Sequence, residues 1–289
     1  MKRYLDPKND LVFKRIFGEH PHLLKSFLNA LMPLEEGRYI ESLEYLSPEN
    51  VPENPLKKFS IVDVRCKDNY GRYFIVEMQM QWSKIFPNRM LLNTTQTYSN
   101  QIEKGYGYGT LQSVYGLGIL NEPFDNKTPE FYHRYQMASC KNTSETIEGI
   151  EIILVELPKF KPETLMEKKM ATLWLRFLKE IKGETEIAED LFANEEIHEA
   201  ITICEKAAFT NDELYIYQRT WMEISTEISS LENSFKDGEA KGIAKGLEKG
   251  RAESEQERQK LKQELSDKDK ELEARNKKIE ELERLLNKQ

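Results

Sequence analysis

Residues 60–80 read SIVDVRCKDNYGRYFIVEMQM, which is two apolar runs on either side of the turn-forming stretch Asp-Asn-Tyr-Gly. A turn cluster between two strand-like runs predicts a β-hairpin with direct antiparallel pairing. Each run carries one carboxylate, Asp63 or Glu77, at a place where the pattern calls for an apolar residue. A carboxylate buried among Ile, Val and Phe is costly unless a counter-charge accompanies it. We therefore expect the two carboxylates to share a cation.

The expected register brings the two carboxylates close together. We expect Cys66 to pair with residues 72–73, which sets Asp63 opposite residues 75–76, and the remaining offset leaves Asp63 near Glu77. Carboxylate oxygens without nearby Cys or His suit Mg²⁺ or Mn²⁺ rather than zinc. Two other interpretations of the spacing stay open. They are a cross-strand ion pair, such as Asp63 with Arg72, and a carboxylate on a solvated face.

The hairpin and three further segments resemble the PD-(D/E)XK nuclease superfamily. More narrowly, they resemble the recombination-promoting nuclease (Rpn) group, whose members are also called PD-(D/E)XK family transposases. The three segments are residues 6–18 (DPKNDLVFKRIFG), similar to an N-terminal helix motif; Arg89–Leu92 with Tyr98, Gln101 and residues 105–108, similar to a helix and loop after the hairpin; and the repeated glycines of the tail. The resemblance covers most of residues 1–160 and the tail. It implies a restriction-endonuclease-like α/β core, a mixed sheet flanked by helices.

The resemblance also implies roles for individual residues. Asp63 and Glu77 would be metal ligands, and the backbone carbonyl of Met78 would face the metal. Gln79 stands at the position of the signature lysine, a replacement typical of this group. Asp10 matches an acidic position on the first helix, where it is either a further ligand or orienting residue, or simply the N-cap of that helix. The implied chemistry is Mg²⁺- or Mn²⁺-dependent hydrolysis of phosphodiester bonds in DNA.

Two departures from the superfamily signature affect this expectation. Val62 stands where the signature has proline. Gln79 can hydrogen-bond the attacking water or a phosphate oxygen, but it brings no positive charge to the scissile phosphate. Lys84 and Lys14 are candidates for the missing cation, and a solvated lysine is the alternative interpretation of each.

Charge is distributed unevenly along the 289 residues. The segment 237–289 contains 14 basic and 14 acidic residues, so the whole net charge of −8 lies in residues 1–236. An acidic body is not typical of a nucleic-acid-binding protein, because phosphate contacts need Lys or Arg. Local basic groups flank the proposed site in the sequence: Lys2-Arg3, Lys14-Arg15, Lys57-Lys58 and Lys104.

The sequence contains no signal for a membrane or for an oxidising compartment. Its three cysteines are well separated and show neither zinc-ligand nor disulfide spacing, and Cys66 is expected in the core. No run reaches the roughly 18 apolar residues of a membrane span, and the N-terminus is charged. We expect a cytoplasmic protein.

The remaining elements complete an α/β layer. We expect two helices within 10–32, a short strand near 39–46, a helix over 87–105, and strands at 114–120, 131–137 and 150–157. The apolar period is helical from about residue 163 to 235. We therefore expect three parts: a nuclease-like domain over 1–160, a helical region over 161–236 that packs on it or extends it, and a tail over 237–289.

The tail combines a glycine repeat with heptads. Gly238, Gly242, Gly246 and Gly250 recur every four residues, which indicates either a close-packing line on a helix or a flexible linker. Leucine or isoleucine then recurs every seven residues from Leu265 to Leu286. This heptad pattern predicts a parallel coiled coil and a homodimer or higher homo-oligomer, with a single solvated helix as the alternative.

The expected function is a divalent-metal-dependent DNA endonuclease of the recombination-promoting type. Its rival is a nuclease fold without catalytic activity that binds DNA or serves as a self-associating scaffold. A second rival is an interaction module built around the tail. Asp63, Glu77 and Gln79 favour the enzyme, because a lost site should show an apolar replacement at one of these positions.

Overall fold

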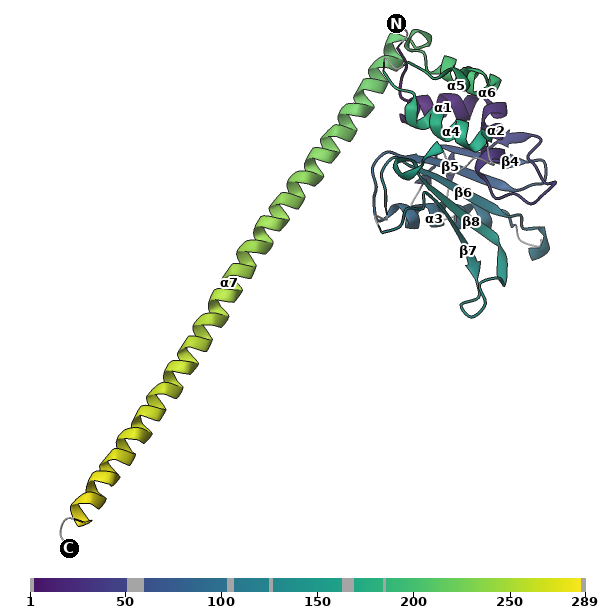
Figure 1. Cartoon of the computed structure of the whole chain (residues 1–289). Coiled ribbons are helices and arrows are strands. Elements are labelled where there is room, and N and C mark those ends of the chain that lie inside the picture. Colours follow the sequence, from purple (N-terminus) through teal and green to yellow (C-terminus); the bar gives the residue numbers. More distant parts are fainter. Residues whose placement is uncertain are drawn as a thin grey trace. The chain divides into compact units, whose positions relative to one another are not determined.

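The computed structural model describes residues 3–50, 60–102, 107–124, 127–162, 169–183 and 186–286 (Figure 1). The chain divides into two compact units, Met1–Ile224 and Ser225–Gln289, which are described separately. The first unit is an α/β layer with a mixed sheet, as expected from the sequence. The second unit is helical.

Six strands form the main sheet, in the order β1-β4-β5-β6-β8-β7. Its strands are β1 (Leu43–Tyr45), β4 (Val64–Asp68), β5 (Tyr73–Gln79), β6 (Val114–Leu120), β7 (Tyr132–Ala138) and β8 (Thr146–Glu156). The β5–β6 and β6–β8 pairs are parallel, whereas β1–β4, β4–β5 and β7–β8 are antiparallel. Two short strands, β2 (Glu49–Asn50) and β3 (Ser60–Ile61), pair separately.

The predicted hairpin forms, but with a different register. Cys66 pairs with Phe74 rather than with residues 72–73, and Val64 pairs with Val76. Asp63 is the residue before Val64, so it lies at the level of Glu77 rather than at the level of residues 75–76. The predicted offset was wrong, and the observed register brings the two carboxylates closer together.

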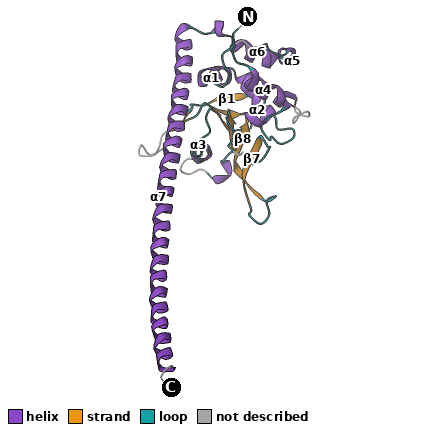
Figure 2. Ribbon diagram, turned by 60° about the vertical axis from the view of Figure 1, so that its left-hand side comes forward, coloured by secondary structure: helices purple, strands orange, loops and turns teal. Residues whose placement is uncertain are grey.

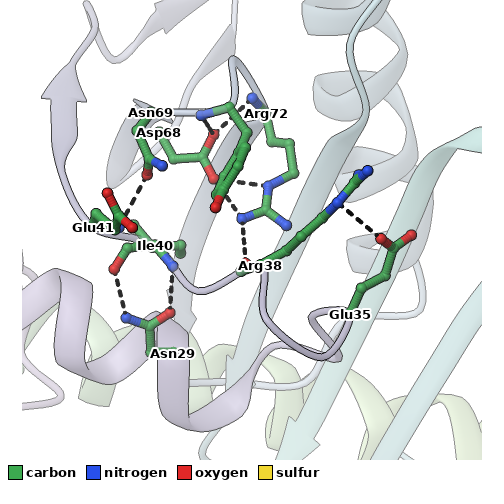
Figure 3. A network of polar contacts seen from close by, with 9 residues as sticks. Asn29, Glu35, Arg38, Ile40, Glu41, Asp68, Asn69 and Arg72 are labelled. Carbon is green, nitrogen blue, oxygen red and sulfur yellow. Dashed lines mark hydrogen bonds and ion pairs between the residues drawn. The ribbon is translucent and has the colours of Figure 1, made fainter.

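A polar network fixes this register at the closed end of the hairpin (Figure 3). Asp68 Oδ2 accepts a 2.7 Å hydrogen bond from Arg72 Nε, and Arg72 Nη2 donates to the carbonyl of Arg38 at 2.9 Å. Gly71 has a φ of +82°, a backbone conformation that glycine adopts without strain. Because Arg72 is committed to Asp68, the alternative in which it pairs with Asp63 is wrong.

Helices cover both faces of the sheet (Figure 2). On one face lie α1 (Asp10–Glu19), α2 (Pro21–Leu31), α4 (Lys169–Glu180) and α6 (Glu195–Ile203), and on the other lies α3 (Phe86–Ser99). The first group packs with Cys66, Phe74 and Val76 in the larger core, which confirms that Cys66 is a core residue. The smaller core joins Phe86 and Met90 of α3 to the other face.

The helical region after β8 shares the larger core with the first helices. Trp174 of α4 packs against Phe17 and Phe27, with ring centroids 5.5 and 5.6 Å apart. The short helix α5 (Glu189–Phe192) leads into α6, and Ile197 and Ile201 of α6 join the same core. The boundary between the two compact units falls between Ile224 and Ser225. The predicted division of the chain into three parts at residues 160 and 236 stays a prediction.

The last helix, α7 (Asn211–Leu286), includes the whole of the second unit that the structure describes. Gly238, Gly242, Gly246 and Gly250 lie inside this helix, so the repeat is helical, and close packing along the line of glycines stays a prediction. Leu265, Leu272 and Ile279 are exposed. Their pairing in a coiled coil stays a prediction. Within the described ranges, no helix is both long enough and apolar enough to span a bilayer.

Candidate metal centre

Asp63 immediately precedes β4 and lies at the level of Glu77 in the neighbouring strand β5. Asp63 Oδ2 accepts a 2.7 Å hydrogen bond from the backbone N–H of Met78, which ties Asp63 to the residue after Glu77. The Asp63 side chain is 20% exposed and that of Glu77 is 4% exposed. The structure thus brings together the two residues that the sequence predicted as a pair.

Helix α3 holds the Glu77 carboxylate from the other side. Asn93 Nδ2 donates to Glu77 Oε1 at 2.7 Å, and Arg89 Nη2 lies 2.8 Å from Glu77 Oε2. Both oxygens of this nearly buried carboxylate therefore have partners, as a buried charge requires. The two partners are four residues apart on α3, a spacing that places them on one helical face.

Gln79 belongs to the same cluster. Its Oε1 accepts a 2.7 Å hydrogen bond from Arg89 Nη2, and its Nε2 donates to the carbonyl of Gln81. Arg89 lies over the Phe86 ring at 5.0 Å from the ring centroid. Arg89 thus bridges Glu77 and Gln79. In the sequence this arginine is visible only as part of a helix motif, and its local pattern does not indicate a role in the site.

Helix α1 contributes a second cation. Lys14 Nζ lies 2.8 Å from Asp10 Oδ1 and 3.8 Å from Asp63 Oδ1. Asn9, not Asp10, caps the helix, because Asn9 Oδ1 accepts from the N–H of Leu11 at 3.1 Å. The N-cap interpretation of Asp10 was therefore wrong, and Asp10 lies in the first turn of α1 beside Lys14.

The electrostatics of this cluster show a surplus of negative charge at Asp63. Burial raises the pKa of Asp63 from 3.8 to about 7, and the charges of Asp10 and Glu77 push it in the same direction. The Met78 N–H and Lys14 oppose this shift in pKa without cancelling it. A cation bound beside Asp63 would relieve the surplus.

The donor set fits a hard divalent ion. Asp63 and Glu77 offer carboxylate oxygens, the ligands that Mg²⁺ and Mn²⁺ prefer. Within the described part of the chain, no three His, Cys, Asp or Glu side chains are placed to hold a metal by themselves. Mg²⁺ commonly binds through one or two carboxylates and keeps several waters, so a two-carboxylate site is sufficient.

Two further polar groups lie away from this cluster. His133 Nε2 lies 2.7 Å from Oε1 of the buried Glu156, and Lys159 Nζ lies 3.0 Å from the same oxygen. The His133 side chain is therefore paired with Glu156. Arg15 pairs with Glu213 at 3.0 Å, so it is committed to packing α1 against the start of α7. The flanking residues Lys2, Lys57-Lys58 and Lys104 lie outside the described residues.

Comparison with known proteins assigns the family. A family model described as "PD-(D/E)XK nuclease family transposase" matches residues 7–237, which is most of the chain and includes every residue of the cluster. No curated protein and no solved structure matches the chain. The match agrees with the resemblance drawn from the hairpin and the first helix. The chain therefore belongs to the PD-(D/E)XK nuclease family transposases, a family that implies a nuclease- or transposase-like function on DNA.

Proposed function

We propose that this protein is a divalent-metal-dependent DNA endonuclease of the recombination-promoting type, located in the cytoplasm, and that Asp63 and Glu77 are its metal ligands. The observation that supports the proposal is the hydrogen bond from Met78 N–H to Asp63, which fixes the Asp63 side chain beside the residue that follows Glu77 in β5. The backbone carbonyl of Met78 and the carboxylate of Asp10 are further candidate ligands. All of these residues lie within the range that matches the family.

Each side chain of the cluster has a role in phosphodiester hydrolysis. A bound Mg²⁺ or Mn²⁺ supplies a Lewis acid and lowers the pKa of a coordinated water. Asp63 and Glu77 hold the ion, and Asn93 fixes the orientation of Glu77 through Oε1. Asp63 Oδ1 lies 3.8 Å from Lys14 Nζ, longer than a hydrogen bond, so it keeps capacity for a ligand. Gln79 hydrogen-bonds the attacking water or a phosphate oxygen.

The test of this proposal is cleavage of supercoiled plasmid by the full-length protein with Mg²⁺, with Mn²⁺ and with EDTA. Glu77→Gln should lower metal-dependent cleavage by about 100-fold or more, because it removes a ligand charge while keeping the size of the side chain. Glu148→Gln on the exposed part of β8 serves as the control and should stay within about two-fold of wild type. Equal cleavage by wild type and Glu77→Gln would contradict the assignment.

A second candidate function is DNA binding or scaffolding by a nuclease fold without activity. One observation favours it: both oxygens of the Glu77 carboxylate already have protein partners, Asn93 and Arg89. Under this alternative, the wild-type protein would retard DNA in a gel but leave it intact with every divalent metal tested.

We also propose that the second unit joins two or more copies of the chain. Leu265, Leu272 and Ile279 stand at seven-residue spacing and are 53–65% exposed, an arrangement typical of coiled-coil seams. Leu272→Glu should therefore convert a dimer or higher oligomer into a monomer in light scattering after gel filtration. Lys277→Glu, outside the heptad line, should leave the mass unchanged. A wild-type protein that is monomeric at micromolar concentration would contradict the proposal.

A further inference from the structure

We propose that Arg89 is the cation that this site uses in place of the signature lysine, and that it competes with the divalent ion for Glu77. This inference rests on the proposed function, because it concerns the same site. It assigns to Arg89 two contacts that alternate: the Glu77 carboxylate in the metal-free protein, and a phosphate oxygen of DNA when a metal ion is bound.

The position of the guanidinium group supports the first half of the inference. The signature lysine would stand at residue 79, and Gln79 Oε1 accepts a 2.7 Å hydrogen bond from Arg89 Nη2. The positive charge therefore lies at the tip of the side chain that replaces the lysine. Lys14 does not reach this place, since its described contacts are with Asp10 and Asp63.

Arg89 has the donors and the access that phosphate binding requires. Its contacts with Glu77 and Gln79 both use Nη2, whereas a guanidinium group carries five N–H donors in a planar fork. The side chain is 46% exposed, so part of that fork faces solvent. The Phe86 ring beneath it, 5.0 Å from centroid to guanidinium carbon, holds its stem against α3. Such a fork suits the oxygens of a phosphate.

Competition with the metal follows from the occupancy of Glu77. Asn93 Nδ2 donates a 2.7 Å hydrogen bond to Glu77 Oε1, and Arg89 Nη2 lies 2.8 Å from Glu77 Oε2. A divalent ion that binds Glu77 must therefore share Oε2 with the guanidinium or take its place. Removing the guanidinium should strengthen metal binding and weaken hydrolysis, two effects of opposite sign. A residue that only held Glu77 in position would weaken both.

The experiment combines calorimetry with cleavage kinetics on the full-length protein. Arg89→Met keeps most of the apolar stem, Arg89→Lys restores a positive charge, and Lys141→Met removes an exposed lysine outside the cluster as the control. Titration with Mn²⁺ in the absence of DNA should show about 3- to 10-fold tighter binding for Arg89→Met than for wild type. Its kcat for plasmid cleavage should fall by about 100-fold, with a smaller change in KM. Arg89→Lys should recover at least about a tenth of the wild-type kcat, and Lys141→Met should match wild type in both measurements.

The outcomes separate this inference from the function on which it rests. Weaker or unchanged Mn²⁺ binding by a folded Arg89→Met variant would overturn the competition, and unchanged cleavage would overturn its role as the missing cation. Wild-type protein that binds Mn²⁺ but cleaves no DNA would refute the endonuclease, while the calorimetric comparison still decides the competition. Wild-type protein that binds no Mn²⁺ would refute both.

Discussion

Asp63→Asn should abolish metal-dependent cleavage and, in EDTA at pH 8, stabilise the folded protein by about 1–3 kcal/mol. The loss of cleavage, about 1,000-fold or more, follows from the removal of a ligand charge from a two-carboxylate site. The gain in stability follows because asparagine removes a buried negative charge, although its amide can still accept the hydrogen bond from Met78 N–H. One substitution is thus expected to improve the fold and destroy the function.

The pH dependence of this effect has a definite sign. In the unfolded chain Asp63 releases its proton near its ordinary pKa of 3.8, whereas in the folded protein its pKa is about 7. Between these two pH values the folded state binds more protons than the unfolded state, so the contribution of Asp63 to stability falls as the pH rises. Above pH 7 the contribution stays at its lowest level. The stability gained by Asp63→Asn should therefore be larger at pH 8 than at pH 5.

Urea denaturation in EDTA at both pH values measures this difference. Glu148→Gln, which removes an exposed carboxylate from β8, should follow the wild-type pH dependence within about 0.5 kcal/mol. An Asp63→Asn protein that is less stable than wild type at pH 8 would show that the carboxylate is already compensated, and it would remove the electrostatic reason for placing a metal there.

The order of elements and the pair of carboxylates could be predicted from the sequence because both depend on local pattern. The two apolar runs and their turn predicted the hairpin, and Asp63 and Glu77 are visible as breaks in those runs. The register could not be predicted, because it depends on the Asp68–Arg72 contacts that close the turn and on the carbonyl of Arg38, a residue far away in the chain. The observed register differs from the expected one by only one or two residues, but this difference decides that Asp63 lies at the level of Glu77.

Arg89 escaped prediction for a different reason. It is twelve residues from Glu77 in the sequence, and helical spacing alone states only that Arg89 and Asn93 share a face. Which residues of the sheet this helical face contacts depends on how α3 packs on the sheet. Docking is close because β6 presents glycine to the helix: a Cβ at Gly116 would lie 2.8 Å from Met90 Sδ, and one at Gly118 would lie 2.9 Å from Phe86 Cε1.

Gly118→Val should therefore lower the free energy of unfolding by about 3 kcal/mol, and it should reduce cleavage as well. The added side chain meets Leu154 Cδ2 and the Phe86 ring, both buried, and the 6.5 Å edge contact with Trp82 limits how far that ring can swing. Relief of the clash must lift the first turns of α3.

That displacement links packing to chemistry, because Arg89 follows Phe86 by three residues and Glu77 pairs with Gly118 across the sheet. Guanidinium-chloride denaturation and plasmid cleavage measure the two effects, with Gly109→Val as the matched control, since no atom lies within 4 Å of the Cβ position there. If cleavage by Gly118→Val stays at the wild-type level under conditions where the protein is fully folded, α3 need not sit close to the sheet for hydrolysis. The contacts of Arg89 and Asn93 with Glu77 would then be dispensable. Loss of cleavage in the folded variant would instead show that the glycines of β6 place the cation beside the carboxylate.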